Sequence, residues 1–488
     1  MSGLHKDGDL TYEILIGCEI HCELKTPTKA FCACENRYGG MPNTRVCPVC
    51  LGLPGAMPVP SKEFVELGAA AGYAFSCGIN RFVTFDRKHY FYPDLVKGYQ
   101  ITQYDIPLCH DGYVMLDGKK IRLERIHLEE DAGKSIHREG GYSYIDFNRS
   151  GVPLIEIVSK PDLSSPEEAA RFMQTVREIL RYIGVTEGNL EEGAMRCDAN
   201  INLKILTNGT EYRTPISEIK NMNSFRSIRD ACTYEAARQL EEFRSNRQTY
   251  TAGFKNTMGW DDAAGRTVIQ RTKNSFTDYR FVVEPDIPPV ILDDAFLAQA
   301  RSRVGELPAE KRDRFRREYG LSDSDAQTLT SERELAEWFE DAAKESGDPG
   351  KVANWILGEL LAVRNDRNIG LSDLPVTPAH IAGLVNALGN NTITSRQARD
   401  VFAEMLETGE LPAAIIRRHG MVQVSDTGVI GKIVAEVFAE NPAALEDYAK
   451  GKTNVVDWLT GQVMKKSRGQ ANPGIASELV QKRLADFS

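Results

Sequence analysis

The stretch Tyr12–Leu24, YEILIGCEIHCEL, decides the first part of the fold. Its apolar residues fall on every second position, which is the period of a β-strand whose two faces meet different surroundings. Cys18 and Cys22 share the apolar phase, so we expect both in the core. The other phase carries three polar residues, Glu19, His21 and Glu23. A glutamate beside a histidine on one strand face is either a site for a hard metal ion or a solvated polar face.

Outward from this strand, residues 1–292 predict an α+β domain of short strands and helices separated by Gly and Pro turns. Further strands are predicted at 121–130, 142–147, 153–158, 196–205 and 211–220. Residues 166–183 predict an amphipathic helix. Its start has Ser165 as N-cap, Pro166 at the first helical position and Glu168 completing a capping box.

Strand signals end after the Pro-rich segment 283–290, VEPDIPPV. Residues 293–410 predict an all-helical domain, and residues 411–488 predict a helical C-terminal tail domain. Although the 488-residue chain has a formal charge of −10, residues 450–488 carry seven Lys or Arg and three acidic residues. Three cations, Lys465, Lys466 and Arg468, cluster in one turn of this tail. Such a turn suits contact with a phosphate backbone, and a solvated surface turn is the alternative.

Composition excludes several classes of protein. Hydrophobic residues make up 42% and charged residues 26%, which is typical of a folded globular chain. No run of about 18 apolar residues exists, so no membrane span is expected. The N-terminus, MSGLHKDGDLTYEILIG, lacks the pattern of a signal peptide, which favours a cytoplasmic location. The ten cysteines are then expected to be thiols or metal ligands, because disulfides are rare in that compartment.

Four cysteines have a spacing that is typical of a zinc site. They are arranged as Cys32-x-Cys34-x12-Cys47-x2-Cys50. Two close pairs joined by a short loop supply the four soft ligands of a tetrahedral Zn²⁺ site. A four-cysteine set has no open position, so the predicted role is structural. Four reduced thiols without metal are the alternative.

Acidic residues also interrupt apolar strand segments. Glu130 shares the apolar phase of residues 126–130, and Glu156 lies inside the apolar run 154–158. An unpaired carboxylate in a strand core is costly, so each should be paired or should coordinate a metal. Asp198 alternates with apolar residues in its own strand. Each alone is explained by a salt bridge at a strand end, but together they favour Mg²⁺, which prefers carboxylate oxygens and nucleotide phosphates.

Standard phosphate-binding loops are missing from the sequence. Residues 133–135, GKS, look like the end of such a loop, but Leu128 stands where its first glycine should be. A bound nucleotide would therefore be held by metals and side chains. The segment 85–108 interleaves basic residues, Lys88 among them, with aromatic residues. This pattern suits phosphate and base contacts as well as an ordinary aromatic core.

Seven strings match a known family in order from about residue 12 to the C-terminus. They are IGCEIHCELKTPTKAFC, FDRKHYFYPDLVKGYQITQ, HLEEDAGKS, GVPLIEIVSKPD, RCDANI, EIKNMNSF and KGKTNVVDWLTGQVMKKSRGQANP. Together they resemble the B subunits of the tRNA-dependent aspartyl/glutamyl amidotransferases. The resemblance implies a cradle-shaped α+β domain followed by a helical domain and a helical tail.

The resemblance also implies an activity and its partners. Glutamate on tRNA(Gln), aspartate on tRNA(Asn), or both would be amidated. ATP and Mg²⁺ would convert the side-chain carboxylate to an acyl phosphate, and ammonia would displace the phosphate. A partner amidase with glutaminase activity, the A subunit, would supply the ammonia, and a small C subunit would complete a heterotrimer. The tail would contact the misacylated tRNA.

Residue roles follow from the matching strings. The resemblance implies five Mg²⁺ ligands: Glu19, His21, Glu130, Glu156 and Asp198. It makes Lys88 a cation near the phosphates, gives Asp198 a catalytic role and adds Glu218 as a weaker candidate. Some members lack the cysteine quartet, so zinc rests on its spacing here. A tRNA-binding scaffold with a decayed metal site and a zinc-dependent hydrolase are the alternatives. The first should have lost acids that are present, and the second needs an open zinc position.

Overall fold

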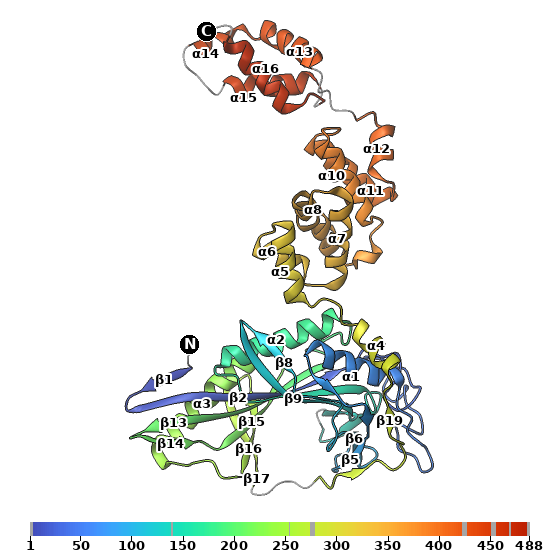
Figure 1. Ribbon diagram of the computed structural model, residues 1–488, viewed down its shortest axis with the longest axis vertical. Helices are drawn as coiled ribbons and strands as arrows, with labels where there is room; N and C mark the ends of the chain where they lie inside the picture. The colour runs from blue at the N-terminus through green and yellow to red at the C-terminus, as the bar shows by residue number, and fades with distance from the viewer. Residues whose placement is uncertain are drawn as a thin grey trace. The chain divides into compact units, whose positions relative to one another are not determined.

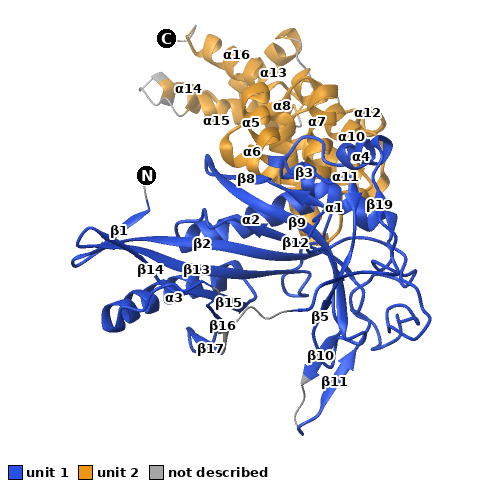
Figure 2. Ribbon diagram, turned by 60° about the horizontal axis from the view of Figure 1, so that its bottom comes forward, with its two compact units in different colours: residues 1–308 blue, residues 309–488 orange. Residues whose placement is uncertain are grey.

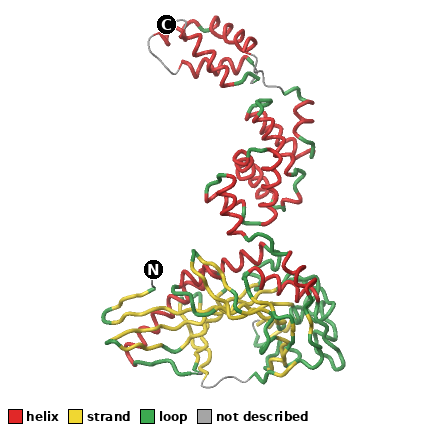
Figure 3. Tube along the Cα trace, viewed as in Figure 1, coloured by secondary structure: helices red, strands yellow, loops and turns green. Residues whose placement is uncertain are grey.

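The computed structural model describes residues 3–137, 140–252, 254–273, 279–421, 427–449, 455–467 and 470–485. The chain divides into two compact units, Met1–Pro308 and Ala309–Ser488 (Figure 2). All described strands belong to the first unit, and the described part of the second unit is helical (Figure 3). The predicted α+β fold with a helical C-terminal part is confirmed.

The first unit contains the following elements in the described residues. Its strands are β1 Leu4–Asp7, β2 Leu10–Glu23, β3 Gly78–Ile79, β4 Phe82–Val83, β5 Asp86–His89, β6 Tyr99–Thr102, β7 Cys109–His110, β8 Tyr113–Leu116, β9 Lys119–Glu130, β10 Lys134–His137, β11 Ser143–Asp146, β12 Pro153–Ser159, β13 Met195–Thr207, β14 Thr210–Arg213, β15 Ile216–Met222, β16 Lys255–Asp261, β17 Arg266–Lys273, β18 Val282–Val283 and β19 Val290–Ile291. Its helices are α1 Lys62–Ala74, α2 Pro166–Tyr182, α3 Phe225–Asn246 and α4 Asp294–Ser302 (Figure 1).

The main sheet has 12 strands among the described residues. Its order is β17-β16-β15-β13-β2-β12-β9-β7-β3, and β1, β14 and β8 pair beside β2, β13 and β9. Strand β2 runs through the middle, with antiparallel β12 and β13 on its two sides (Figure 2). Strands β15 and β16 run parallel to each other. The predicted strand at 211–220 is two strands, because Pro215 between β14 and β15 has no N–H for a ladder hydrogen bond.

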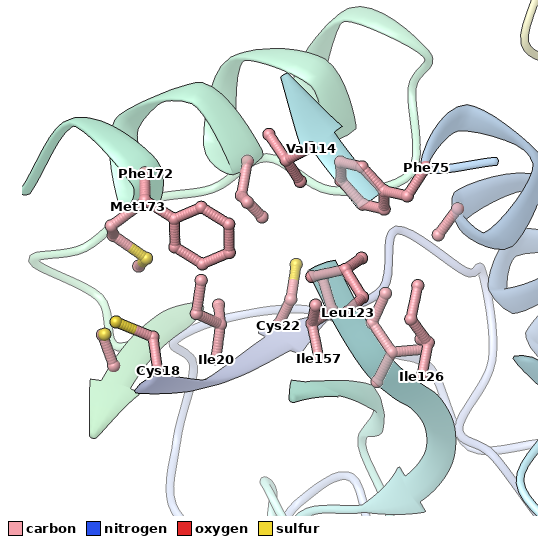
Figure 4. Close-up of a cluster of buried hydrophobic side chains, with 14 of the residues drawn as sticks. Cys18, Ile20, Cys22, Phe75, Val114, Leu123, Ile126, Ile157, Phe172 and Met173 are labelled. Atoms are coloured by element: carbon pink, nitrogen blue, oxygen red, sulfur yellow. The ribbon is translucent and has the colours of Figure 1, made fainter. Parts of the chain in front are cut away.

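One face of this sheet forms the core of the first unit. Helices α1, α2 and α3 contact it through β9, β2 and β13. Cys18 and Cys22 point from β2 toward the side of the sheet on which Phe172 and Met173 of α2 lie (Figure 4). Both cysteines are at most 1% exposed, so their predicted place in the core is confirmed. Because β2 alternates, its polar residues face the other side of the sheet.

Helix α2 begins largely as its sequence predicts. Ser165 is the N-cap, and its side chain accepts a hydrogen bond from the backbone N–H of Glu168. The predicted capping box is wrong, because the Glu168 carboxylate accepts from the backbone N–H of Ser164 at 2.8 Å instead. Lys119 of β9 also pairs with this carboxylate at 2.7 Å, which holds it near Ser164. The ion pair with Lys119 of β9 thus takes the place of the capping-box hydrogen bond from the Ser165 backbone N–H to the Glu168 carboxylate.

The second unit is built from helices, and α5 begins at its boundary. The helical segments are α5 Pro308–Tyr319, α6 Asp323–Leu329, α7 Arg333–Ser346, α8 Pro349–Trp355, a π-helical segment Ile356–Leu360, α9 Leu361–Arg367, a 3-10 turn Leu371–Asp373, α10 Pro378–Gly389, α11 Ser395–Thr408, α12 Pro412–Arg418, α13 Thr427–Glu440, α14 Pro442–Ala449, α15 Val455–Lys466 and α16 Pro473–Ala485. None of the described helices combines the length and apolar character needed to cross a membrane.

Buried side chains of the second unit gather in two separate clusters. One spans residues 315–416 and the other spans residues 430–484. Helix α12 contributes Ile415 and Ile416 to the first of these clusters. Helix α4, by contrast, packs Leu297 and Ala300 into the core of the first unit. The domain boundaries after residues 292 and 410 stay predictions.

Candidate active site

The sheet face opposite the helices carries charged side chains on adjacent strands. His127 of β9 lies directly opposite Glu156 of β12, and Glu156 lies opposite His21 of β2. Farther along β2, Glu19 lies opposite Asp198 of β13. Period-two alternation on four strands therefore brings these side chains to one polar surface.

His21, Glu129 and Glu156 form what we call the first group. Each offers a ligand atom within 4.8 Å of the other two. His21 Nε2 is 3.4 Å from Glu156 Oε2. The Glu129 carboxylate accepts hydrogen bonds from Gln100 and Thr102 of β6, which fix its orientation. An imidazole and two carboxylates at this spacing fit a divalent cation.

Electrostatics keep the first group ionised. Burial acts to raise the pKa of Glu129, but the Lys88 ammonium and His127 outweigh it and hold the pKa at about 2. Burial also acts against Glu156, yet His127 and His21 hold its pKa well below the usual value. For His127, burial acts to lower the pKa, and the carboxylates of Glu156 and Glu129 raise it to about 9. Both carboxylates are therefore available as anionic oxygen ligands near neutral pH.

Lys88 reaches the first group from a separate sheet of three strands, β18-β5-β6. Its ammonium lies 5.4 Å from the centre of the Tyr279 ring. Burial acts to lower the pKa of Lys88, but Glu129 and Glu156 raise it overall. Lys88 is thus a permanent cation beside the first group, and its role toward phosphates stays a prediction.

The second group consists of three carboxylates, those of Glu19, Asp198 and Glu218. Their oxygens also lie within 4.8 Å of one another. Asn200 donates to Glu19 at 2.7 Å, and Thr257 donates to Glu218 at 3.1 Å. The Asn200 amide oxygen is buried without a hydrogen-bond partner among the described residues. This donor set is rich in hard oxygen atoms, as Mg²⁺ requires.

Glu130 lies outside both groups. It forms a buried ion pair with Lys97 and accepts a hydrogen bond from the backbone N–H of Ile101 at 3.0 Å. The requirement that a buried carboxylate be paired or bind metal is thus met by Lys97. Its role as an Mg²⁺ ligand stays a prediction, and the adjacent Glu129 is the glutamate of β9 that lies in the first group.

Glu129 and His127 were not among the residues predicted from the sequence. A usable signal was present, because His127-x-Glu129 repeats on β9 the polar alternation that Glu19-x-His21 shows on β2. The sequence favours Glu130 instead, because Glu130 shares the apolar phase of β9.

The four predicted zinc ligands come together. The sulfur atoms of Cys32, Cys34, Cys47 and Cys50 lie within 4.8 Å of one another, and the ten cysteines, all at positions that the structure describes, are free of disulfides. Hydrogen bonds from Cys32 and the Cys47 amide, together with the Lys29 ammonium, outweigh burial and lower the pKa of Cys50 to about 4. A thiolate among converging sulfurs fits a structural Zn²⁺ site.

The basic tail is only partly described. Lys465 is exposed near the end of α15. Lys466 pairs with Glu436 at 3.0 Å and with Glu440, both on α13. Arg468 lies outside the described residues. A role of these cations in tRNA binding stays a prediction.

The polar face of this mixed sheet gathers two groups of side chains that could hold a metal ion, beside the half-buried Lys88, and such an arrangement is typical of enzymes that act on phosphate groups. Comparison agrees, because residues 14–298 match the GatB/GatE catalytic domain and residues 337–484 match the GatB domain. The chain belongs to the family of aspartyl/glutamyl-tRNA(Asn/Gln) amidotransferase B subunits, so the resemblance in the sequence is confirmed.

Curated relatives carry this family name and match along nearly their whole length. The aspartyl/glutamyl-tRNA(Asn/Gln) amidotransferase B subunit of Treponema denticola is 64% identical over 491 residues, covering 99% of this chain and 100% of the relative. Its namesake in Treponema pallidum is 58% identical, covering 98% and 95%. That of Borrelia turicatae is 46% identical, covering 98% and 100%.

Proposed function

We propose that this chain amidates the side-chain carboxylate of glutamate on tRNA(Gln), of aspartate on tRNA(Asn), or of both, at the expense of ATP. The observation that carries the proposal is the polar sheet face, where the first and second groups lie on neighbouring strands. A scaffold with a decayed metal site would not keep both sets of ionisable ligands within 4.8 Å. A zinc hydrolase would need an open zinc position, and the cysteine quartet offers none.

The chemistry sets what the site must do. A carboxylate is a poor electrophile, so ATP first transfers a phosphoryl group to it, and ammonia then displaces phosphate to form the amide. Mg²⁺ bound by the two groups would neutralise charge on the transferring phosphoryl and on the leaving ADP. The proposed ligands are Glu19, His21, Glu129, Glu156, Asp198 and Glu218, and Glu130 keeps the supporting ion pair with Lys97.

The chain's own residues contribute fixed charge and orientation. Lys88 places a permanent cation beside Glu129 and Glu156, where negative charge develops on phosphate oxygens. Gln100 and Thr102 hold the Glu129 carboxylate through hydrogen bonds. No covalent enzyme intermediate is required, because ATP and ammonia supply both reacting groups.

Partners follow from the chemistry. Ammonia must be generated nearby, so we propose that a partner glutaminase, the A subunit, supplies it and that a small C subunit completes a heterotrimer. The misacylated tRNA is the substrate, and its body would contact the tail through Lys465, Lys466 and Arg468. The reaction would take place in the cytoplasm, where tRNAs are charged. A structural Zn²⁺ held by Cys32, Cys34, Cys47 and Cys50 would shape the adjacent loop.

The decisive experiment supplies ammonia directly, so that the glutaminase is bypassed. The chain with its partner subunits, ammonium chloride, ATP and Glu-tRNA(Gln) or Asp-tRNA(Asn) should yield the amidated product and ADP. Glu156→Gln should abolish both products while the partner's glutaminase stays detectable. Tight tRNA binding without ADP or amide formation would instead identify a scaffold.

A further inference from the structure

The second group differs from the first in the cations that face it. Lys220 of β15 forms an ion pair with Asp198 and lies 3.5 Å from Glu218. Lys255 of β16 lies 3.2 Å from Glu218 and 3.9 Å from Glu19. Two ammonium groups therefore contact all three carboxylates. Three negative charges are offset by two positive ones before any metal ion arrives.

The first group has one nearby lysine, Lys88, whose ammonium lowers the pKa of Glu129 without forming an ion pair with its carboxylate. Among the described residues, no lysine or arginine comes within ion-pair distance of Glu129 or Glu156, whose ionic contacts are with His21 and His127. A neutral imidazole is itself a metal ligand, so His21 can stay when a metal binds. An ammonium has three donors and no acceptor, so it can only compete for the same carboxylate oxygens. A metal ion at the first group can therefore bind alongside His21, whereas a metal ion at the second group must compete with ammonium groups.

Competition at the second group is direct. Lys220 contacts the carboxylates of Asp198 and Glu218, and a divalent cation at the second group would use the same two carboxylates. Two like charges cannot occupy this space together without strong repulsion at short range. A divalent cation bound by Asp198 would therefore favour a different position for the Lys220 ammonium. The ammonium must then find another anion close to its strand.

We propose that Lys220 occupies the second cation position before nucleotide binds, and that a metal ion arriving with the nucleotide displaces it toward the phosphate oxygens. This inference rests on the proposed function, because that function brings a metal–nucleotide complex to this face. Lys220 is then a binding residue for phosphate as well as a placeholder. Its flexible four-carbon stem, 38% exposed at the side chain, allows the change of partner.

One consequence is a metal count that depends on nucleotide. Without nucleotide, the first group should bind one divalent cation tightly and the second group should bind one only weakly. With a non-hydrolysable ATP analogue, both should fill, because the phosphates receive the released ammonium. Lys255 contacts Glu218 and Glu19 but not Asp198, so the proposal assigns the exchange to Lys220, which pairs with Asp198.

The test is a Mn²⁺ titration of the full-length chain bound to its partner subunits, followed by electron paramagnetic resonance. Lys220→Met keeps most of the apolar stem and removes the charge. Lys204→Met is the matched control, because Lys204 is similarly exposed at 34% and pairs with Glu13 and Glu211, outside both groups. The wild type should bind one Mn²⁺ tightly alone and two with the analogue.

Lys220→Met should bind the second Mn²⁺ at least about tenfold more tightly without nucleotide, while its affinity for the analogue falls by a similar factor. Simple loss of folding would weaken both, so these opposite shifts identify the placeholder role. Lys204→Met should match the wild type. Unchanged Mn²⁺ affinity in folded Lys220→Met would overturn the proposal.

The wild type alone provides an independent check should Lys220→Met fail to fold. Two tight Mn²⁺ ions in the wild type without nucleotide would overturn the proposal, whatever the variant does. Failure of the proposed function would look different, since the wild type would then form no amide from misacylated tRNA. The Mn²⁺ counts separate that outcome from failure of the Lys220 inference.

Discussion

His127 lies directly opposite Glu156 across β9 and β12, with 3.2 Å between His127 Nε2 and Glu156 Oε2. The same nitrogen is 3.5 Å from Glu129 Oε2, so one ring N–H faces both carboxylates of the first group. The other ring nitrogen, Nδ1, is buried without a hydrogen-bond partner among the described residues. His127 therefore orients two carboxylates of the first group without belonging to the group itself.

Replacing His127 should weaken metal binding at the first group. We expect His127→Leu to lower Mn²⁺ affinity by about tenfold, because residues that orient metal ligands typically contribute about 10- to 100-fold. His127→Gln, which keeps an N–H donor near the position of Nε2, should retain much of the affinity. Titration calorimetry with Mn²⁺ measures both. His419→Leu removes an exposed histidine paired with Glu404 and serves as the control. Wild-type affinity in His127→Leu would contradict this role.

The first group should also make stability depend on pH in metal-free protein. The folded pKa of His127 is raised from 6.5 to about 9, so its contribution is fully present below pH 6.5 and is lost as pH rises through 9. The folded pKa of Glu129 is lowered from 4.5 to about 2, so its contribution is present above pH 4.5 and is lost as pH falls through 2. Together they stabilise the fold most between pH 4.5 and 6.5.

Urea unfolding in the presence of a chelator tests this dependence. Between about pH 6 and pH 9.5, the wild type should lose up to about 3 kcal/mol more unfolding free energy than His127→Leu does. Parallel pH profiles for the two proteins would show that the charge on His127 does not stabilise the fold.

The local sequence predicts the polar residues of β2 better than those of β9. The alternation of Tyr12–Leu24 was sufficient to place Glu19 and His21 on the polar face, because strand period depends on nearest neighbours alone. The choice between Glu129 and Glu130 depends on where β9 ends and on Lys97, 33 residues before Glu130. The contacts of Lys220 and Lys255 with the second group could not be predicted, because they join different strands and no local sequence pattern indicates them.

Substitution of the neighbouring residues Glu129 and Glu130 should therefore impair the protein in different ways. Glu129→Gln should abolish ATP-dependent amidation and lower Mn²⁺ affinity, because it removes an anionic ligand of the first group. Glu130→Gln leaves the buried Lys97 ammonium unpaired, so its main effect should be a loss of about 3 kcal/mol in unfolding free energy. Amidation assays, Mn²⁺ titration and urea unfolding on both variants separate the two effects. If Glu130→Gln kept wild-type stability but lost Mn²⁺ binding completely, Glu130 would be the metal ligand after all.

The cysteine quartet should bind one Zn²⁺ per chain, measured by elemental analysis of protein purified without chelators. Lys29 is fully buried, and its ammonium donates to the Arg45 carbonyl at 2.8 Å and contacts Cys50 Sγ at 3.7 Å. Its positive charge offsets thiolate charge, so Lys29→Met should weaken zinc retention against a competing chelator. Lys62→Met, at an exposed position, is the control. Metal-replete protein without zinc would contradict the site.

The tail should bind tRNA independently of the chemistry. Removing residues 411–488 would also take Ile415 and Ile416 from the cluster at 315–416, so the cleaner truncation removes residues 427–488. We expect this truncation to raise the Kd for misacylated tRNA by at least about tenfold, because cations that neutralise phosphates provide much of such affinity. The rate at saturating tRNA should stay within about twofold, since the two groups lie in the first unit.

Single substitutions in the tail should show how much each cation contributes. Lys465→Ala and Arg468→Ala should each reduce the slope of log affinity against log salt by about 0.7 to 0.9, the value for one lost phosphate contact. Lys466→Ala should change it less, because Glu436 and Glu440 already neutralise that ammonium. Lys351→Ala, which removes an exposed lysine paired with Asp348, controls for a general change in charge. Fluorescence anisotropy with labelled tRNA from about 50 to 200 mM salt measures these slopes. If the truncated chain binds as tightly as the full chain across that range, the tail does not hold the tRNA and its basic character has another cause.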